Sequence, residues 1–226
     1  MPLPAVIQDS LDPLLLHWRY GDRPLHLKLL QAARKRFWYR SEKRVYVYPV
    51  DRIHRLPRPQ LLRRDHFEDL AYYERTGSSQ LAPEAYREVA RARLEQGEHL
   101  YTMVEGDRLV HHAWLVPHHV RETDTVIGQV FFAPAGSAAL FDFHTHPRAR
   151  GRGLFFKAIC QLLHDVPATR ARQAFIYVYA DNGPSRHVIE KVGFQYVGSM
   201  INEARLHQHR RYAVSGGGEF PTALLP

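Results

Sequence analysis

The residues of this chain best suited to chemistry form a short basic turn that carries two glycines. A β-prone run at residues 139–146 leads into Pro147, and an apolar pattern at helical spacing begins at Leu154. The first turn of a helix presents N–H groups without helical partners and the positive end of the helix dipole, so it attracts anions. Glycines let a diphosphate approach the backbone, and arginines offer forked donors. The turn therefore predicts a phosphate site made by Arg148, Arg150, Gly151, Arg152 and Gly153.

A plain strand-to-helix connection with solvated arginines would have the same local pattern, so the turn needs support from elsewhere in the chain. Residues 173–180 form a second β-prone run, which the segment 181–184 interrupts. Residues 185–192 have the spacing of a short helix, and Gly193 can end that helix before a further strand at 194–198. The chain therefore contains two strand–turn–helix units in succession.

The two units together resemble the GNAT superfamily of N-acetyltransferases. The segment Pro147-Arg148-x-Arg150-Gly151-x-Gly153 is similar to the family's Q/R-x-x-G-x-G/A loop, which holds the pyrophosphate of coenzyme A. The segment Asn182-x-x-Ser185, followed by Glu190-Lys191-Val192-Gly193-Phe194, resembles the strand and helix that line the pantetheine arm and the reacting thioester. The resemblance implies that acetyl-CoA or another acyl-CoA is the donor, and that Asn182 and Ser185 help the turn to bind it.

The same resemblance implies an α/β fold of the α+β kind, with a central mixed, mostly antiparallel, splayed β-sheet flanked by helices. It implies a donor cleft between the strand that ends at Pro147 and the strand that ends at Ala180. Two helices are expected before the sheet's second strand, and the resemblance assigns them to the wall that binds the acceptor. From the sequence, helices are expected at 63–77 and 82–97, and strands at 44–50, 99–104, 109–116, 123–132 and 205–214.

Acyl transfer to an amine by direct attack, which the resemblance implies, requires a group that removes a proton from the acceptor. Strict alternation along the strand at 139–146 puts Asp142, His144 and His146 on one face. It puts Phe141, Phe143 and Thr145 on the other. We expect Asp142 or His144 to be the catalytic base, with a relay through water as the alternative, and His146 to be structural.

One position departs from the family's pattern. Many members carry a tyrosine seven residues after the asparagine, where it protonates the departing sulfur, but that position is Ile189 here. Three alternatives stay open: coenzyme A leaves as the thiolate, another group such as His187, Tyr177 or Tyr179 replaces the acid, or the domain does not catalyse. The non-catalytic alternative is a coenzyme A-binding or membrane-docking module.

The acceptor is the least determined part of the reaction. Aromatic side chains near the early helices would suit an amino sugar, an aryl amine or an acyl chain, although the same residues would also be ordinary in a core. The expected cleft is lined by Tyr72, Tyr73, His112, Trp114 and Phe131.

Composition limits the other possibilities. The 226 residues are enough for one ordinary domain, and the single cysteine, Cys160, excludes a disulfide framework and is expected to be a buried, inert thiol. The fifteen histidines lack the HExxH or mixed Cys/His spacing of zinc sites, so we expect no metal. No apolar run of membrane-spanning length and no signal-like start is present, so we expect a cytoplasmic protein. We also expect a bacterial protein that is a monomer or a homodimer.

Much of the net charge of +8 lies at residues 23–44, where Pro24 can begin an amphipathic helix. Such a helix could bind an anionic membrane at its inner face, or an acyl carrier protein that replaces free acyl-CoA as donor. It could equally pack on the domain with solvated cations. Charge alone, without specific motifs, argues only for non-specific attraction to nucleic acid. We therefore divide the chain into a basic extension (1–43), a GNAT-like domain (44–215) and a flexible tail (216–226).

Overall fold

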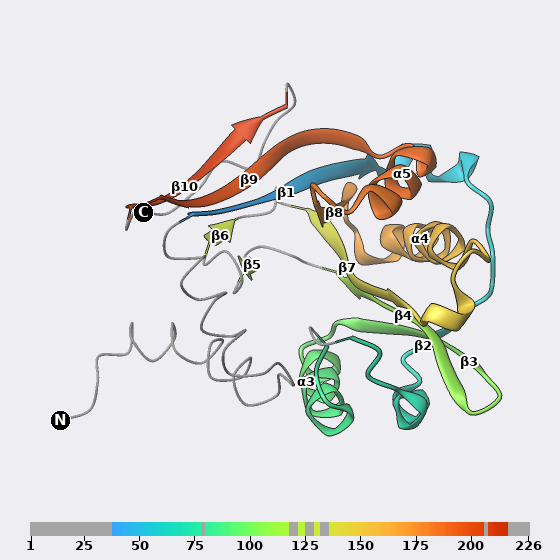
Figure 1. Ribbon diagram of the computed structural model, residues 1–226. Helices are drawn as coiled ribbons and strands as arrows, with labels where there is room; N and C mark the ends of the chain where they lie inside the picture. Colours follow the sequence, from blue (N-terminus) through green and yellow to red (C-terminus); the bar gives the residue numbers. More distant parts are fainter. Residues whose placement is uncertain are drawn as a thin grey trace.

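The computed structural model describes residues 38–77, 80–117, 122–124, 129–131, 136–205 and 208–216. Its main feature is a long, twisted β-sheet with helices on both faces (Figure 1). The predicted amphipathic helix after Pro24 and nearly all of the predicted tail lie outside the described residues, so both stay predictions.

The elements alternate between strands and short helices along the described chain. The strands are β1 (Trp38–Pro49), β2 (Arg63–Arg64), β3 (His99–Glu105), β4 (Arg108–Val116), β5 (Glu122–Asp124), β6 (Gln129–Phe131), β7 (Ser137–Thr145), β8 (Gln173–Tyr179), β9 (Gln195–Arg205) and β10 (Gln208–Ser215). The α-helices are α3 (Pro83–Glu95), α4 (Leu154–Asp165) and α5 (Gly183–Val192). The 3₁₀ segments are η1 (Val50–Arg55), η2 (Phe67–Tyr72), η3 (Pro147–Ala149) and η4 (Val166–Thr169).

Eight of these strands form one sheet in the order β10-β9-β1-β8-β7-β4-β3-β2, while β5 and β6 pair with each other. Neighbouring strands run antiparallel except β7 and β8, which run parallel. Within these two fully described strands, ladder pairing extends only from Ser137↔Gln173 to Ala139↔Phe175. Beyond those pairs the strands diverge, so the predicted mixed, mostly antiparallel, splayed sheet is confirmed.

The two faces of the sheet pack against different helices because side chains alternate along each strand. On one face, Tyr101 and Leu115 pack in the main core with α4 and α5. On the other, Leu100 and Trp114 pack against η2 and α3 (Figure 1). The main core contains Cys160, which is fully buried, and burial raises the pKa of its thiol to about 11. This agrees with the inert thiol expected from the sequence.

The N-terminal strand differs from the prediction. A strand was expected at 44–50, as the family's first strand, but β1 begins at Trp38 and lies between β8 and β9. The last residues of the predicted extension therefore belong to the sheet, where they pair with β9. Val45 and Val47 lie on one face of β1, and Tyr46 and Tyr48 lie on the other. Both faces pack in a hydrophobic core, which suits a strand inside the sheet. The predicted strand at 123–132 is also replaced, by the separate pair β5 and β6.

The helix predicted at 63–77 is wrong, whereas the one at 82–97 is confirmed by α3. In place of the first helix are β2 and η2. The reason is a competing set of hydrogen bonds between Asp65 and β3. Asp65 adopts φ +58, its N–H donates to the Leu100 carbonyl (2.7 Å), and its Oδ1 accepts from the Leu100 N–H (2.9 Å). These bonds draw the segment onto β3 and stop it from coiling.

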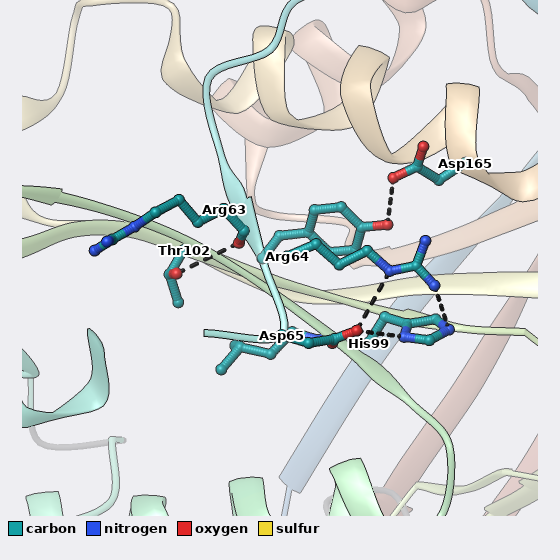
Figure 2. Close-up of polar contacts among 8 residues, drawn as sticks. Arg63, Arg64, Asp65, His99, Thr102 and Asp165 are labelled. Atoms are coloured by element: carbon teal, nitrogen blue, oxygen red, sulfur yellow. Dashed lines mark hydrogen bonds and ion pairs between the residues drawn. The ribbon is translucent and has the colours of Figure 1, made fainter. Parts of the chain in front are cut away.

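Figure 2 shows the polar group that joins β2 to β3 and lies beside α4. Asp65 Oδ2 lies 2.9 Å from His99 Nδ1, and Arg64 Nη2 lies 2.7 Å from His99 Nε2. Next to them, the buried Tyr101 donates its hydroxyl to Asp165 Oδ2 at 2.6 Å. The group therefore links the edge of the sheet to the C-terminal end of α4.

We expect Tyr101→Phe to destabilise the fold through loss of the bond to Asp165. A hydrogen bond to a charged group contributes about 2 kcal/mol, so a decrease of that order in the free energy of unfolding is expected from urea titration. Tyr48→Phe is the matched control, because the Tyr48 hydroxyl donates to the neutral Arg52 carbonyl at 3.1 Å. An equal or smaller loss for Tyr101→Phe than for the control would contradict this link.

Candidate functional site

The basic turn lies between β7 and α4, and both of its glycines have positive φ angles. Gly151 has φ +78 and Gly153 has φ +70, a region that glycine enters without strain. A methyl group at either position would have no other heavy atom within 4 Å, so the space above the glycines is open. Gly153 caps the N-terminus of α4, whose first N–H groups lack helical partners. The turn therefore offers an accessible, donor-rich backbone.

The three arginines of the turn have different neighbours. Arg150 donates from Nε to the Thr145 carbonyl at 3.3 Å, which leaves its other guanidinium donors available. Arg152 makes a two-pronged ion pair with Glu105 in the β3–β4 hairpin, at 2.6 and 2.7 Å. Arg148 uses its backbone N–H to donate to His146 Nδ1. All three side chains are exposed, as a site for a soluble anion requires.

Helix α5 of the second strand–helix unit begins at the same end of the sheet as α4, because β7 and β8 are parallel. Asn182 is the N-cap of α5, and its Oδ1 accepts from the Ser185 N–H at 3.2 Å. This bond gives Asn182 a structural role, since an Asn cap satisfies a free helix donor, but it uses only the backbone N–H of Ser185. Their predicted role in binding coenzyme A stays a prediction.

A β-bulge at Asp142 changes the faces of β7. The register with β4 shifts between His112↔His144 and Trp114↔Phe141, and Asp142 adopts φ +53. A bulge inserts one extra residue into the strand and so reverses the alternation beyond it. Phe141 packs with the α3 side, whereas Phe143 packs with the α4 side. The prediction that these two share a face was wrong.

Asp142 and His144 nevertheless both face the α3 side. Asp142 Oδ2 accepts from Arg93 Nη1 of α3 at 2.8 Å. The Arg93 guanidinium also lies over the rings of Trp114 (5.1 Å) and Phe141 (4.7 Å), which fixes its position. The Asp142 carboxylate is therefore held in place with one of its oxygens engaged.

His144 has the properties of a neutral base. Its Nε2 lies 3.2 Å from Thr76 Oγ1, and its ring lies 5.4 Å from the His112 ring. Burial, followed by the nearby Arg150 charge, lowers the pKa of His144 below the ordinary histidine value. The imidazole is therefore unprotonated at neutral pH and can accept a proton.

Most of the aromatic residues expected to line an acceptor cleft belong to the core. Tyr73, His112 and Trp114 are 6%, 3% and 0% exposed, and Tyr73 stacks on Tyr86 with ring centroids 4.5 Å apart. Tyr72 is the exception at 43% exposed. The side chain of Phe131 lies outside the described residues. Because aromatic residues serve cores and clefts alike, the sequence could not separate the two.

Ile189, which occupies the position of the missing tyrosine, is fully buried in the core. Of the three proposed substitutes, His187 on α5 is exposed. Tyr177 and Tyr179 on β8 share a neighbour that the sequence did not reveal, Lys43 of β1. The Lys43 ammonium, in a residue only 6% exposed, lies 4.6 and 4.9 Å from their ring centroids.

The described residues contain neither a metal-binding cluster nor a membrane-spanning helix. In that part of the chain, no cluster of three or more His, Cys, Asp or Glu side chains could hold a metal ion. Among the helices described there, none is long and apolar enough to cross a membrane.

The chain matches a known protein family over its middle part. A family model described as the acetyltransferase (GNAT) domain matches residues 60–195, more than half of the chain. The match runs from just before β2 to the first residue of β9 and includes the basic turn, Asp142, His144 and α5. A comparison with curated proteins finds no match.

Solved structures that are similar to the chain share little sequence with it. It is similar to an acetyltransferase of the GNAT family from Colwellia psychrerythraea, with a TM-score of 0.52, 12% identity, and coverage of 79% of this chain and 60% of that one. It is also similar to a GCN5-related N-acetyltransferase from Sphaerobacter thermophilus (TM-score 0.47, 11% identity, 88% and 59% covered). A third is a functionally unknown conserved protein from Staphylococcus epidermidis (TM-score 0.48, 10% identity, 81% and 68% covered). The chain thus spans about 60 to 70% of these proteins' length, and at such identities the likeness concerns the fold alone.

The buried histidine beside the site predicts a pH dependence of stability. Burial lowers the pKa of His112 to about 4, whereas in the unfolded chain the value is about 6.5. Between these values the unfolded state binds a proton that the folded state does not, so the free energy of unfolding falls as the pH falls. The contribution is fully present above about pH 6.5 and amounts to roughly 3 kcal/mol.

His112→Phe should therefore flatten this part of the stability curve. Phenylalanine keeps an aromatic ring next to Tyr86, 5.1 Å away in the wild type, but does not titrate. The test is urea unfolding of both proteins from about pH 7 down to about pH 4, the range bounded by the two pKa values. Parallel curves for the two proteins would show that His112 is not buried in its neutral form.

Proposed function

The chain belongs to the GNAT acetyltransferase family, and we propose that it transfers an acetyl or other short acyl group from acyl-CoA to an amine acceptor by direct attack. Membership confirms the resemblance noted in the sequence and supports N-acetyltransfer with an acyl-CoA donor. The observation that carries the proposal is the open glycine turn at the start of α4, beside a neutral His144 on the adjoining strand.

For the donor, we propose that the turn binds the pyrophosphate of coenzyme A. Backbone N–H groups around Gly151 and Gly153 would receive phosphate oxygens, and Arg148, Arg150 and Arg152 would add charge. The pantetheine arm would then follow the gap where β7 and β8 diverge, toward the start of α5. Asn182 and Ser185 would border that path.

For proton removal, the proposed roles of Asp142 and His144 differ. Asp142 is held by Arg93 and suits the task of attracting and orienting the acceptor ammonium. His144, neutral at pH 7, suits removal of the proton as the nitrogen attacks the thioester carbonyl. The Asp142 bulge interrupts the ladder next to the gap, and its backbone N–H groups are candidates to stabilise the developing oxyanion.

For the leaving group, the two tyrosines beside Lys43 are the proposed source of a proton. The Lys43 ammonium would also stabilise negative charge on a departing sulfur if coenzyme A leaves as the thiolate. Tyr177 is the better candidate, because it follows the last β7–β8 pair at Phe175 by two residues and is on the same face of β8.

Two alternative functions remain: acyl transfer from an acyl carrier protein, and binding of coenzyme A or a membrane without turnover. A carrier protein, or a membrane at its inner face, would bind the basic stretch at 23–44 and would need its cations at the surface, whereas a module that binds coenzyme A would use the glycine turn. Arg40 meets this condition, with a side chain 56% exposed, but Lys43 is buried beneath tyrosine rings. Support for these alternatives must therefore come mainly from the residues before β1.

Thermal unfolding with acetyl-CoA, free coenzyme A and longer acyl-CoA species tests donor binding. A ligand at a hundred times its dissociation constant stabilises a protein by about 2.7 kcal/mol, which raises the midpoint measurably. Arg150→Glu should abolish the shift, because a negative charge then faces the diphosphate. Arg170→Glu is the matched control, since Arg170 is also an exposed arginine but follows η4, after α4.

Thiol release with probe amines then separates the enzyme from a binding module. Glucosamine and tyramine are suitable probes of the proposed acceptor classes, and His144→Gln should reduce turnover by about a hundredfold or more. A midpoint shift without thiol release from a wider amine panel would favour the binding module. Absence of any shift would favour a carrier-protein donor and overturn the acyl-CoA proposal.

The pair between Arg152 and Glu105 predicts a second effect on donor binding. If Arg152 contacts a donor phosphate, Glu105 competes for it, and Glu105→Gln should tighten coenzyme A binding by roughly a few-fold at low salt. Calorimetric titration measures this. The same change in an Arg152→Gln background should have no effect. Weaker binding in Glu105→Gln would mean instead that the pair holds the turn in its competent shape.

A further inference from the structure

The segment after Tyr73 forms a compact polar turn directed at His144. Gln80 Oε1 accepts two bonds from Thr76, one from its N–H at 2.7 Å and one from its hydroxyl at 3.1 Å. The Gln80 N–H donates to the Gly77 carbonyl at 3.2 Å and closes the turn. The Thr76 oxygen, fixed in this way, lies 3.2 Å from His144 Nε2.

The hydrogen count of this turn decides the direction of the bond to His144. A threonine hydroxyl has one proton and accepts through its oxygen, and the amide oxygen of glutamine only accepts. Because Gln80 Oε1 receives the Thr76 proton, the Thr76 oxygen must accept from His144. His144 therefore carries its proton on Nε2, and Nδ1 is the unprotonated nitrogen.

We propose that Thr76 and Gln80 are positioning residues that hold His144 in the tautomer with the proton on Nε2, so that Nδ1 is the atom that takes the acceptor's proton. The tautomer follows from the contacts alone, whereas the role of Nδ1 rests on the proposed acetyltransfer. Neither Thr76 nor Gln80 carries a charge, so they select one nitrogen without favouring protonation of the ring.

The surroundings of His144 support a base that functions while neutral. Of the charged and titratable groups that act on it, Arg150 and His146 disfavour its protonation and Asp142 favours it. The His112 ring, from β4, is tilted against the His144 ring with centroids 5.4 Å apart, and burial lowers the pKa of His112 to about 4, which keeps it neutral. When His144 accepts a proton, its Nε2–H keeps its bond to Thr76 and Asp142 offsets the new charge.

The proton balance of the step is simple. The acceptor ammonium first loses one proton to water, and as its nitrogen then forms the bond to the thioester carbon, a second proton moves to Nδ1 of His144. The C–S bond breaks and its electron pair leaves with sulfur. The imidazolium then gives its proton to water, which restores the original tautomer, while the sulfur takes a proton from Tyr177 or leaves as the thiolate.

His146 provides an internal reference on the same strand end. Its Nδ1 accepts from the Arg148 N–H at 3.2 Å, and its Nε2 lies 3.5 Å from Glu74 Oε2. Its tautomer is therefore also fixed with the proton on Nε2, but by groups other than Thr76. Changes at Thr76 should leave the His146 signals unaltered.

The test is nitrogen NMR of the full chain labelled with ¹⁵N-histidine, at about pH 8, well above the ordinary histidine pKa of about 6.5. Signals of His144 are assigned by their loss in His144→Gln. In the wild type they should show a protonated Nε2 and a bare Nδ1. Thr76→Val, which has the same shape without the hydroxyl, should shift His144 toward the other tautomer, and so should Gln80→Leu. Thr76→Ser should preserve the wild-type pattern.

Thiol release with acetyl-CoA and the probe amines supplies the second readout. Thr76→Val should lower kcat about tenfold while the KM for acetyl-CoA stays unchanged, and Thr76→Ser should restore kcat, as expected if only part of the general-base contribution is lost. A wild-type His144 protonated on Nδ1, or a tautomer that Thr76→Val leaves unaltered, would overturn the assignment. The expected tautomers without thiol release from any amine would leave the assignment standing and overturn the acetyltransfer proposal instead.

Discussion

The separation of two parallel strands is the constraint on which the rest of the site depends. β7 and β8 pair over their first residues and then diverge. Helices α4 and α5, which follow them, begin at the end of the sheet where the two strands are apart. Parallel direction brings both helix N-termini to one end of the sheet. Divergence leaves the two strands without a shared ladder at that end. The basic turn, the asparagine cap and the polar face of β7 all take their positions from this geometry.

Elements whose signals are local could be predicted from the sequence. The glycines of the basic turn and Gly193 after α5 have positive φ angles that other residues rarely adopt, so their types alone marked the turns. The β3–β4 hairpin, β7, β8 and the helices α3, α4 and α5 followed from periodicity in the same way. Agreement between local pattern and final fold is what a minimally frustrated sequence provides.

The features that escaped prediction depend on partners far away in the chain. The segment after Arg63 has a helical pattern, but Asp65 finds better backbone partners on β3. The bulge at Asp142 is a one-residue slip that period-two alternation cannot reveal, although it decides which aromatic side chain joins which core. Lys43 could be counted as a cation, but not foreseen as the buried neighbour of two tyrosines. In each case the deciding partner lies on another element of the fold.

The central place of β1 has a consequence for the order in which the molecule can assemble. Its ladder partners β8 and β9 follow it by more than half of the chain's length, so this pairing has a high contact order and a large loop-closure cost. During synthesis β1 leaves the ribosome before the other described strands. Its valine and tyrosine side chains then stay without their partners until β8 and β9 have been made. The strand that completes the middle of the sheet is thus the segment most in need of protection from aggregation, and closure of the sheet around it should be a late event in folding.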